Sequence, residues 1–268
     1  MRKSRRSTTG PGNGGRTVVW RSLNPLGLLA IGAGLALWQI LASAADDYLF
    51  PPVSEVAGEL RELLSDGTLT DALQETLAKG LLGLATGVTA GVVVGRLMAG
   101  SRLVTDSMAP LVSAVFPIPR LAIYPLLVIA MGAGGEAAVV LVAVEAFFPI
   151  LYSVQIGAAS VSQRYRWLMS NVGVSHLQRE ALVGRAMTPG LVAGLRNAVP
   201  TMLVVVVVTE LMTGSSGAGF MVRDAGNQFE PARALAVVTA LGIVGALLNA
   251  VLRKAHERTE RWSLSLQS

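Results

Sequence analysis

The stretch Ser160-Val-Ser-Gln-Arg-Tyr-Arg-Trp-Leu-Met-Ser-Asn-Val-Gly173-Val-Ser175-His-Leu-Gln178 separates two long apolar runs of the chain. It predicts two short amphipathic helices that meet at Gly173, because a glycine after a helix takes positive φ without a Cβ penalty. Ser175 is placed to cap the second helix, and Gln178 stands three residues further on, as a capping box requires. We interpret this elbow between two membrane spans as a moving part of a transporter that pushes on something in the cytoplasm.

The composition places the chain in a membrane. Mean hydropathy is +0.55, only 15% of the 268 residues are charged, and long apolar runs recur. The chain contains no cysteine, which excludes disulfides and thiolate metal sites. The net charge of +5 comes from basic residues at the ends of the apolar runs, which form no groove with interleaved aromatics, so the sequence argues against nucleic acid as a partner.

Six apolar segments are long enough to cross a membrane. Only helices or closed barrels satisfy the backbone in lipid, so we expect an all-α fold, a polytopic membrane helical bundle with six transmembrane helices. A segment at 51–71 is too acidic to span, and its apolar residues recur at a near-helical spacing that predicts a short surface helix. The expected spans are 26–45, 77–97, 108–131, 137–158, 190–212 and 232–252.

Lysine and arginine gather on alternate sides of the expected spans. They are frequent in the tail 1–22, after the second span, in the elbow and after the sixth span, and rare in the other loops. By the positive-inside rule both termini and the loop 159–189 face the cytoplasm. We expect the basic tail 1–22 to be disordered and 263–268 to form a short cytoplasmic tail. Ala42-Ser43-Ala44 resembles a signal-peptidase site, but cleavage would leave five spans, so we expect the first span to be retained.

Four glycines of the second expected span recur every four residues. Gly83, Gly87, Gly91 and Gly95 therefore share one face of that helix and allow another helix to approach closely. The pattern has two interpretations, packing within the chain and contact with another subunit, and we favour packing within the chain.

Prolines interrupt the third expected span. Pro110, Pro117, Pro119 and Pro125 each remove a backbone donor and disturb the helical ladder. Broken membrane helices occur where they line a cavity or are covered by protein. This span is therefore the one expected to border a pathway.

Three charged residues inside expected spans are the candidate translocation-pathway residues. Arg120 and Glu145 are each about halfway along their spans and so share a depth, whereas Glu210 is nearer the outer end of its span. A mid-span charge costs about 2.5–3.5 kcal/mol and seldom faces lipid. Two interpretations stay open: an Arg120–Glu145 ion pair that locks two helices, or an Arg120 that attracts an anionic substrate while a glutamate orients it.

The sequence lacks the common motifs of enzymes. HExxH, GxxxxGK[ST] and clustered metal ligands are absent. Gly214-Ser215-Ser216-Gly217 fits a motif of intramembrane serine proteases, but a serine nucleophile needs a base within hydrogen-bond reach. Both His176 and His256 lie on the cytoplasmic side of the expected topology, opposite this stretch. We therefore expect no catalytic residue, no metal and no cofactor, and a tight external loop at these glycines.

Three stretches carry a family resemblance. Leu168-Met-Ser-Asn-Val-Gly173, Thr188-Pro-Gly-Leu-Val-Ala-Gly-Leu-Arg196 and Thr209-Glu-Leu-Met-Thr-Gly-Ser-Ser-Gly-Ala-Gly-Phe220 resemble the permease subunits of ATP-binding-cassette (ABC) importers. They are most similar to the nitrate, sulfonate and taurine branch. The likeness covers about residues 26–262, and further similar stretches are 49–56, 117–125 and 147–150.

The resemblance implies a type I ABC-importer permease fold over 23–262, without an ATP site of its own. It implies a pore in the plasma (cytoplasmic) membrane, formed with a second permease that is alike or different. Two cytoplasmic ATPase subunits would drive it, and an extracytoplasmic substrate-binding protein would deliver the solute. The solute class it suggests is a small organic or inorganic anion such as a sulfonate or nitrate, and vitamin precursors stay open because close relatives carry them.

In that family the elbow is the coupling helix that docks on the ATPase. The family's Glu-Ala-Ala signature is replaced here by Trp167-Leu168-Met169. A secondary transporter is the alternative class; it would act without an ATPase, and such proteins usually show internal repeats, which this sequence does not. The resemblance assigns the ATPase contact to Trp167, Leu168, Met169, Val172, Gly173, Ser175 and Leu177.

Overall fold

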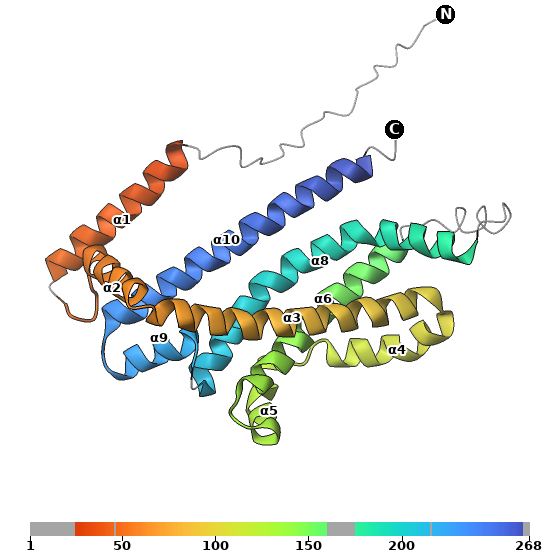
Figure 1. Ribbon diagram of the computed structural model, residues 1–268, viewed down its shortest axis with the longest axis horizontal. Helices are drawn as coiled ribbons and strands as arrows, with labels where there is room; N and C mark the ends of the chain where they lie inside the picture. Colours follow the sequence, from red (N-terminus) through yellow and green to blue (C-terminus); the bar gives the residue numbers. More distant parts are fainter. Residues whose placement is uncertain (1–24, 46, 160–174, 215, 265–268) are drawn as a thin grey trace, which may run out of the picture.

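The computed structural model describes residues 25–45, 47–159, 175–214 and 216–264, and the regular structure in these ranges is helical throughout, so the predicted all-α fold is confirmed. Helix α6 packs between α3 and α8, and α10 packs on α8 (Figure 1). The elements are α1 (Pro25–Ala45), α2 (Val53–Ser65), α3 (Thr68–Gly100), α4 (Arg102–Val115), the 3-10 helix η1 (Arg120–Ile123), α5 (Tyr124–Met131), α6 (Gly135–Ala159), α8 (His176–Thr213), α9 (Ala218–Asn227) and α10 (Pro231–Leu264).

Five described helices are long and apolar enough to cross a membrane, namely α1, α3, α6, α8 and α10. The third expected span is broken, as its prolines predicted: α4 and the η1–α5 segment qualify only together, and they meet at 80°. Three helices are much longer than expected, since α3 begins at Thr68, α8 begins at His176 and α10 ends at Leu264. The 38 residues of α8 extend about 57 Å, which exceeds a hydrocarbon core of about 30 Å, so part of α8 projects from the membrane.

The short surface helix predicted within 51–71 is α2. Its Val56 and Leu63 are buried in an apolar cluster shared with α3, α9 and α10, because residues at near-helical spacing lie on one face. The Asp66 carboxylate then accepts a hydrogen bond from the Thr68 N–H at 2.9 Å, at the start of α3. This bond holds the pKa of the Asp66 carboxyl below its usual value.

Helices α3 and α6 meet along the glycine face of α3. Gly83, Gly87, Gly91 and Gly95 are all buried there, against the backbone and side chains of α6. A Cβ on Gly83 would lie 2.7 Å from the Val139 carbonyl oxygen, closer than real Cβ atoms approach their neighbours. The stripe therefore makes a contact within the chain and brings the two backbones together.

Helix α6 also packs on α8. Leu141 and Val142 of α6 share a buried apolar cluster with Ala198, Met202 and Val206 of α8. Because α6 has the most extensive contacts with both α3 and α8, it is the central helix of the bundle. Packing on both helices therefore fixes the position of the α6 residues that face the third span.

Candidate translocation site

The third span breaks at Pro117 and Pro119. Proline lacks the N–H that continues a helix and disfavours a helical conformation in the residue before it. Helix α4 ends at Val115, Pro119 is extended with φ −68° and ψ 92°, and η1 begins at Arg120. The break takes Arg120 out of a continuous helix, and its side chain reaches Glu145 of α6.

Arg120 and Glu145 form an ion pair. The Arg120 Nε lies 2.9 Å from the Glu145 Oε1, and the two side chains are 19% and 12% exposed. The rings of Phe116 and Phe148 lie 5.6 and 5.1 Å from the guanidinium carbon, within the range of cation–π contacts. The Arg120 Nη1 is buried and has no hydrogen-bond partner in the described structure. The site thus holds a permanent cation whose Nη1 amino group is unused.

Glu210 has a different set of partners. Its side chain is 2% exposed, and its Oε1 lies 3.1 Å from the Lys79 Nζ. Its Oε2 accepts hydrogen bonds from the Thr76 hydroxyl at 2.8 Å and from the Gly219 N–H at 2.9 Å. Both carboxylate oxygens are occupied within the chain, so the structure separates Glu210 from the Arg120–Glu145 pair.

A second cation, Arg223, caps the C-terminal end of α8. The last carbonyls of a helix have no partner within it, and the Arg223 guanidinium of α9 donates to the carbonyl oxygens of Gly214 at 2.6 Å and Met212 at 3.3 Å. A cation at this end also complements the helix dipole. The side chains that hold the turn between α8 and α9 are named the junction cluster: Thr76, Lys79, Glu210 and Arg223.

Sequence reasoning missed most of the junction cluster. Lys79 lies inside the second expected span, so the cost of a charge in lipid that singled out Arg120 would have found it too. Thr76 carried no signal of its own, because a threonine in a helix often bonds its own backbone. Its partner Glu210 is 134 residues away in the chain.

The glycine-rich stretch predicted as a tight loop is the turn between α8 and α9. Gly217 has φ +98°, a conformation that favours glycine. The Ser216 hydroxyl donates to the Glu75 carboxylate, and the Ser216 carbonyl oxygen lies 3.3 Å from the Lys79 Nζ. Ser216 is therefore tied to α3 by a carboxylate and an ammonium group, an arrangement that holds a turn.

The elbow lies mostly outside the described residues, and so do Trp167, Leu168, Met169, Val172 and Gly173. The predicted cap is confirmed, with the Gln178 N–H 3.4 Å from the Ser175 Oγ and the Ser175 N–H 3.2 Å from the Gln178 Oε1. This capping box starts α8, whose first turn contains Leu177. The side chain of Leu177 lies outside the part of the chain that the structure describes.

Comparison with known proteins places these features in a family. Residues 87–262 match the family described as binding-protein-dependent transport system inner membrane component. The chain is 28% identical to the taurine transport system permease protein TauC of Escherichia coli, over 94% of this chain and 96% of the relative. It is 26% identical to the nitrate import permease protein NrtB of Synechocystis, over 82% of this chain and 84% of the relative. It is also 26% identical to the formylaminopyrimidine transport permease protein ThiX of Halalkalibacterium halodurans, over 85% and 92% of the two chains.

The family match, the membrane-length helices and the relatives all indicate a membrane permease. The match covers well over half of the chain, including the break at Pro117–Pro119 and the whole of α6, α8 and α9. The relatives are permeases, which are membrane channel subunits rather than enzymes. The chain therefore belongs to the binding-protein-dependent transport system inner membrane components, as a multi-pass permease of the ABC importers in the sulfonate, taurine and nitrate branch.

Proposed function

We propose that this chain is the membrane-spanning subunit of an ATP-driven importer for a small organic or inorganic anion, such as a sulfonate or nitrate. The observation that carries the anion class is the Arg120 guanidinium, which stands at a break in a membrane span with a buried, unpartnered Nη1. The names of relatives, which include taurine and nitrate permeases, support the same class.

The geometry around Arg120 suits an oxyanion. An arginine keeps its charge at any physiological pH and presents a planar fork that matches sulfonate, carboxylate or nitrate oxygens. Glu145 occupies the Nε and the rings of Phe116 and Phe148 lie against the guanidinium, so the fork has a fixed direction. An orphaned buried donor costs about 1–3 kcal/mol, which an arriving oxygen atom would offset. Both carboxylate oxygens of Glu210 are bound by groups of the protein. Glu210 would therefore hold the helices together and would not contact the solute.

A second permease would cover the side of the molecule formed by α4 and α5. Helix α4 has no buried residue, and Leu103 of α4 and Ile129 of α5 are 77% and 81% exposed. Lipid can cover apolar side chains, but an interrupted backbone at membrane depth needs protein or a water-filled cavity beside it. The break at Pro117–Pro119 supports a pore built between this face and a partner permease.

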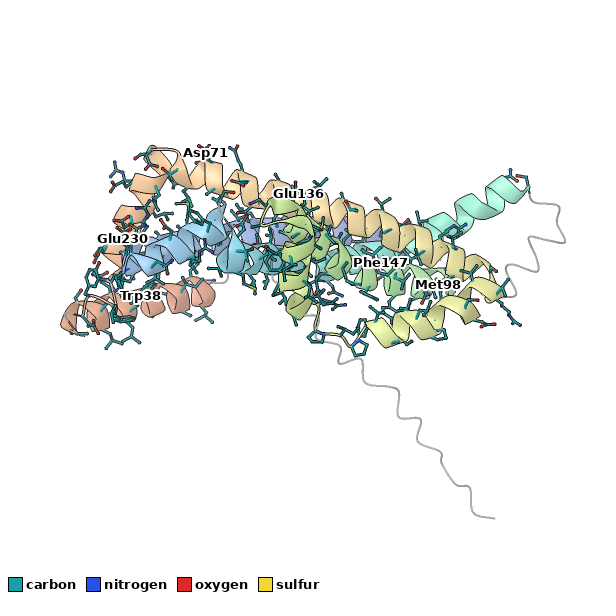
Figure 2. The ribbon with its side chains drawn as sticks, turned by 90° about the horizontal axis from the view of Figure 1, so that it is seen from below. Trp38, Asp71, Met98, Glu136, Phe147 and Glu230 are labelled. Atoms are coloured by element: carbon teal, nitrogen blue, oxygen red, sulfur yellow. The ribbon has the colours of Figure 1, made fainter. Side chains whose placement is uncertain are left out.

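The family suggests the remaining partners, and the distribution of lysine and arginine suggests how the chain is oriented in the membrane. ATPase subunits would bind the loop 159–189 on the cytoplasmic side, and a binding protein would deliver solute on the other. Asp71 and Glu230 lie at one end of the bundle and Met98 near the other (Figure 2). The end near Met98 carries Arg96 and Arg102, as the positive-inside rule requires of a cytoplasmic end.

Uptake by reconstituted transporter tests the proposal. Proteoliposomes would hold this chain with its ATPase, its binding protein and any second permease, and accumulation of labelled taurine and of nitrate would be measured. Arg120→Gln should reduce uptake about ten- to a hundredfold while assembly is intact, because a charged hydrogen-bond partner is lost. Arg102→Gln, an exposed arginine at the start of α4, is the matched control and should change little.

Three other outcomes would contradict parts of this proposal. Normal uptake by a fully assembled Arg120→Gln variant would refute the anion role. Recovery of uptake when Arg120→Glu is combined with Glu145→Arg would show that the pair only locks two helices. Uptake driven by an ion gradient without the ATPase would favour a secondary transporter.

A further inference from the structure

The η1–α5 segment that carries Arg120 has one fully buried side chain. Of the residues in Arg120–Met131, all of which the structure describes, only Tyr124 is buried, with 2% of its surface exposed. Leu126 and Ile129 on the same segment are 63% and 81% exposed. Leu127 and Val128 pack partly against the core, and Tyr124 is the deepest contact of the segment with the bundle.

Tyr124 is bound to the end of α8. Its hydroxyl lies 2.7 Å from the Thr213 hydroxyl, and the two share a hydrogen bond. A buried tyrosine hydroxyl normally finds such a partner, because leaving it unpaired is costly. Arg120 stands about one turn before Tyr124, so the residue that docks the segment and the cation proposed to meet the solute are close neighbours.

Thr213 is held in turn by the junction cluster. It follows Glu210 by three residues, and the Gly214 N–H donates to the Glu210 carbonyl oxygen at 2.9 Å. Arg223 donates to the Gly214 carbonyl oxygen at 2.6 Å. A small cavity of about 20 Å³, room for about one water, is lined by Tyr124 together with Lys79 and Glu210 of the cluster.

We propose that Tyr124 and Thr213 are positioning residues for Arg120. Their hydrogen bond docks the η1–α5 segment on the junction cluster and thereby sets where the guanidinium stands beside Glu145. Without that bond, the segment keeps the Arg120–Glu145 ion pair and the apolar packing of Leu127 and Val128, neither of which fixes its orientation at the end of α8. The inference rests on the proposed function only where it names Arg120 as the solute contact.

Spin-label distances test the docking directly, in the full-length chain in lipid nanodiscs. The sequence has no cysteine, so Leu121→Cys, next to Arg120 on η1, and Ile156→Cys, further along α6, give a clean reporter pair. Tyr124→Phe and Thr213→Val should each broaden the 121–156 distances and raise the undocked fraction about fivefold, the size expected for one hydrogen bond. Thr213→Ser keeps the hydroxyl and should keep the docked distances.

Two controls separate docking from general loosening. The double variant Tyr124→Phe with Thr213→Val should be no broader than either single variant, because both remove the same bond. A second label pair, Leu82→Cys on α3 and Val144→Cys on α6, should be unaffected. Unchanged 121–156 distances in Tyr124→Phe, additive effects in the double variant, or equal broadening at 82–144 would each overturn the proposal. The measurement needs no solute, so it can fail while the anion role of Arg120 stands, and the reverse.

Discussion

Replacing Gly91 by alanine adds one methyl group where α3 meets α6. The new Cβ would lie 2.8 Å from the Phe147 carbonyl oxygen and 3.0 Å from the Ile150 Cβ, against about 3.4 Å for ordinary contact. Because the closest atom belongs to the backbone, no side chain can swing aside, and the two helices must separate by about half an ångström. Overpacking of this kind costs about 1–3 kcal/mol, which outweighs the roughly 1 kcal/mol by which alanine is the better helix former. We expect a net loss of up to about 2 kcal/mol.

Thermal unfolding of the purified chain in detergent measures this effect. Gly91→Ala should lower Tm by up to about 8 °C, at about 2–4 °C for each kcal/mol. Gly34→Ala in α1 is the matched control, because nothing lies within 4 Å of its new Cβ, and its Tm should stay or rise. Val93→Leu, on the exposed face of α3, should also be tolerated. If Gly91→Ala and Gly34→Ala unfold at the same temperature, the close contact of α3 and α6 is not what stabilises the bundle.

Two further predictions concern orientation and coupling. With single cysteines, an impermeant thiol reagent in intact cells should label Ser65→Cys in α2 well before Ser175→Cys at the start of α8, and the opposite order would overturn the proposed cytoplasmic elbow. Changing Leu168→Asp together with Met169→Asp should release the ATPase, because an amphipathic helix docks through its apolar anchors, while membrane insertion is kept. Unchanged co-purification of the ATPase and unchanged solute-stimulated ATP hydrolysis would contradict the elbow as its docking site.

Features that depend on neighbouring residues were predictable. The break at Pro117–Pro119 follows from a missing N–H, whatever packs around it. The capping box of Ser175 and Gln178 needs only a spacing of three residues. Helix lengths were less predictable: α8 starts 14 residues before the apolar run expected at 190–212, because a polar helix projecting from the membrane carries no hydropathy signal.

The candidate site was predictable in part. The cost of charge in lipid drew attention to Arg120 and Glu145, and their equal depth made a contact between them a natural hypothesis. The same argument grouped Glu210 with them, but depth along a span says nothing about which helix faces which. In the structure Glu210 meets Thr76 and Lys79 on α3.

The sequence by itself determined the membrane class, the apolar segments, the surface helix α2 and the glycine face of α3, because each of these is written in composition or in a helical period of a few residues. Only the tertiary structure decided that the glycine face meets α6, that Arg223 closes the end of α8 and that Tyr124 docks the broken segment on Thr213. These contacts join residues on different helices, and a hydrophobic period specifies that a face is buried without specifying its partner. The partner is settled by shape and by the need of each buried polar group for a hydrogen bond, which act only once the helices are packed.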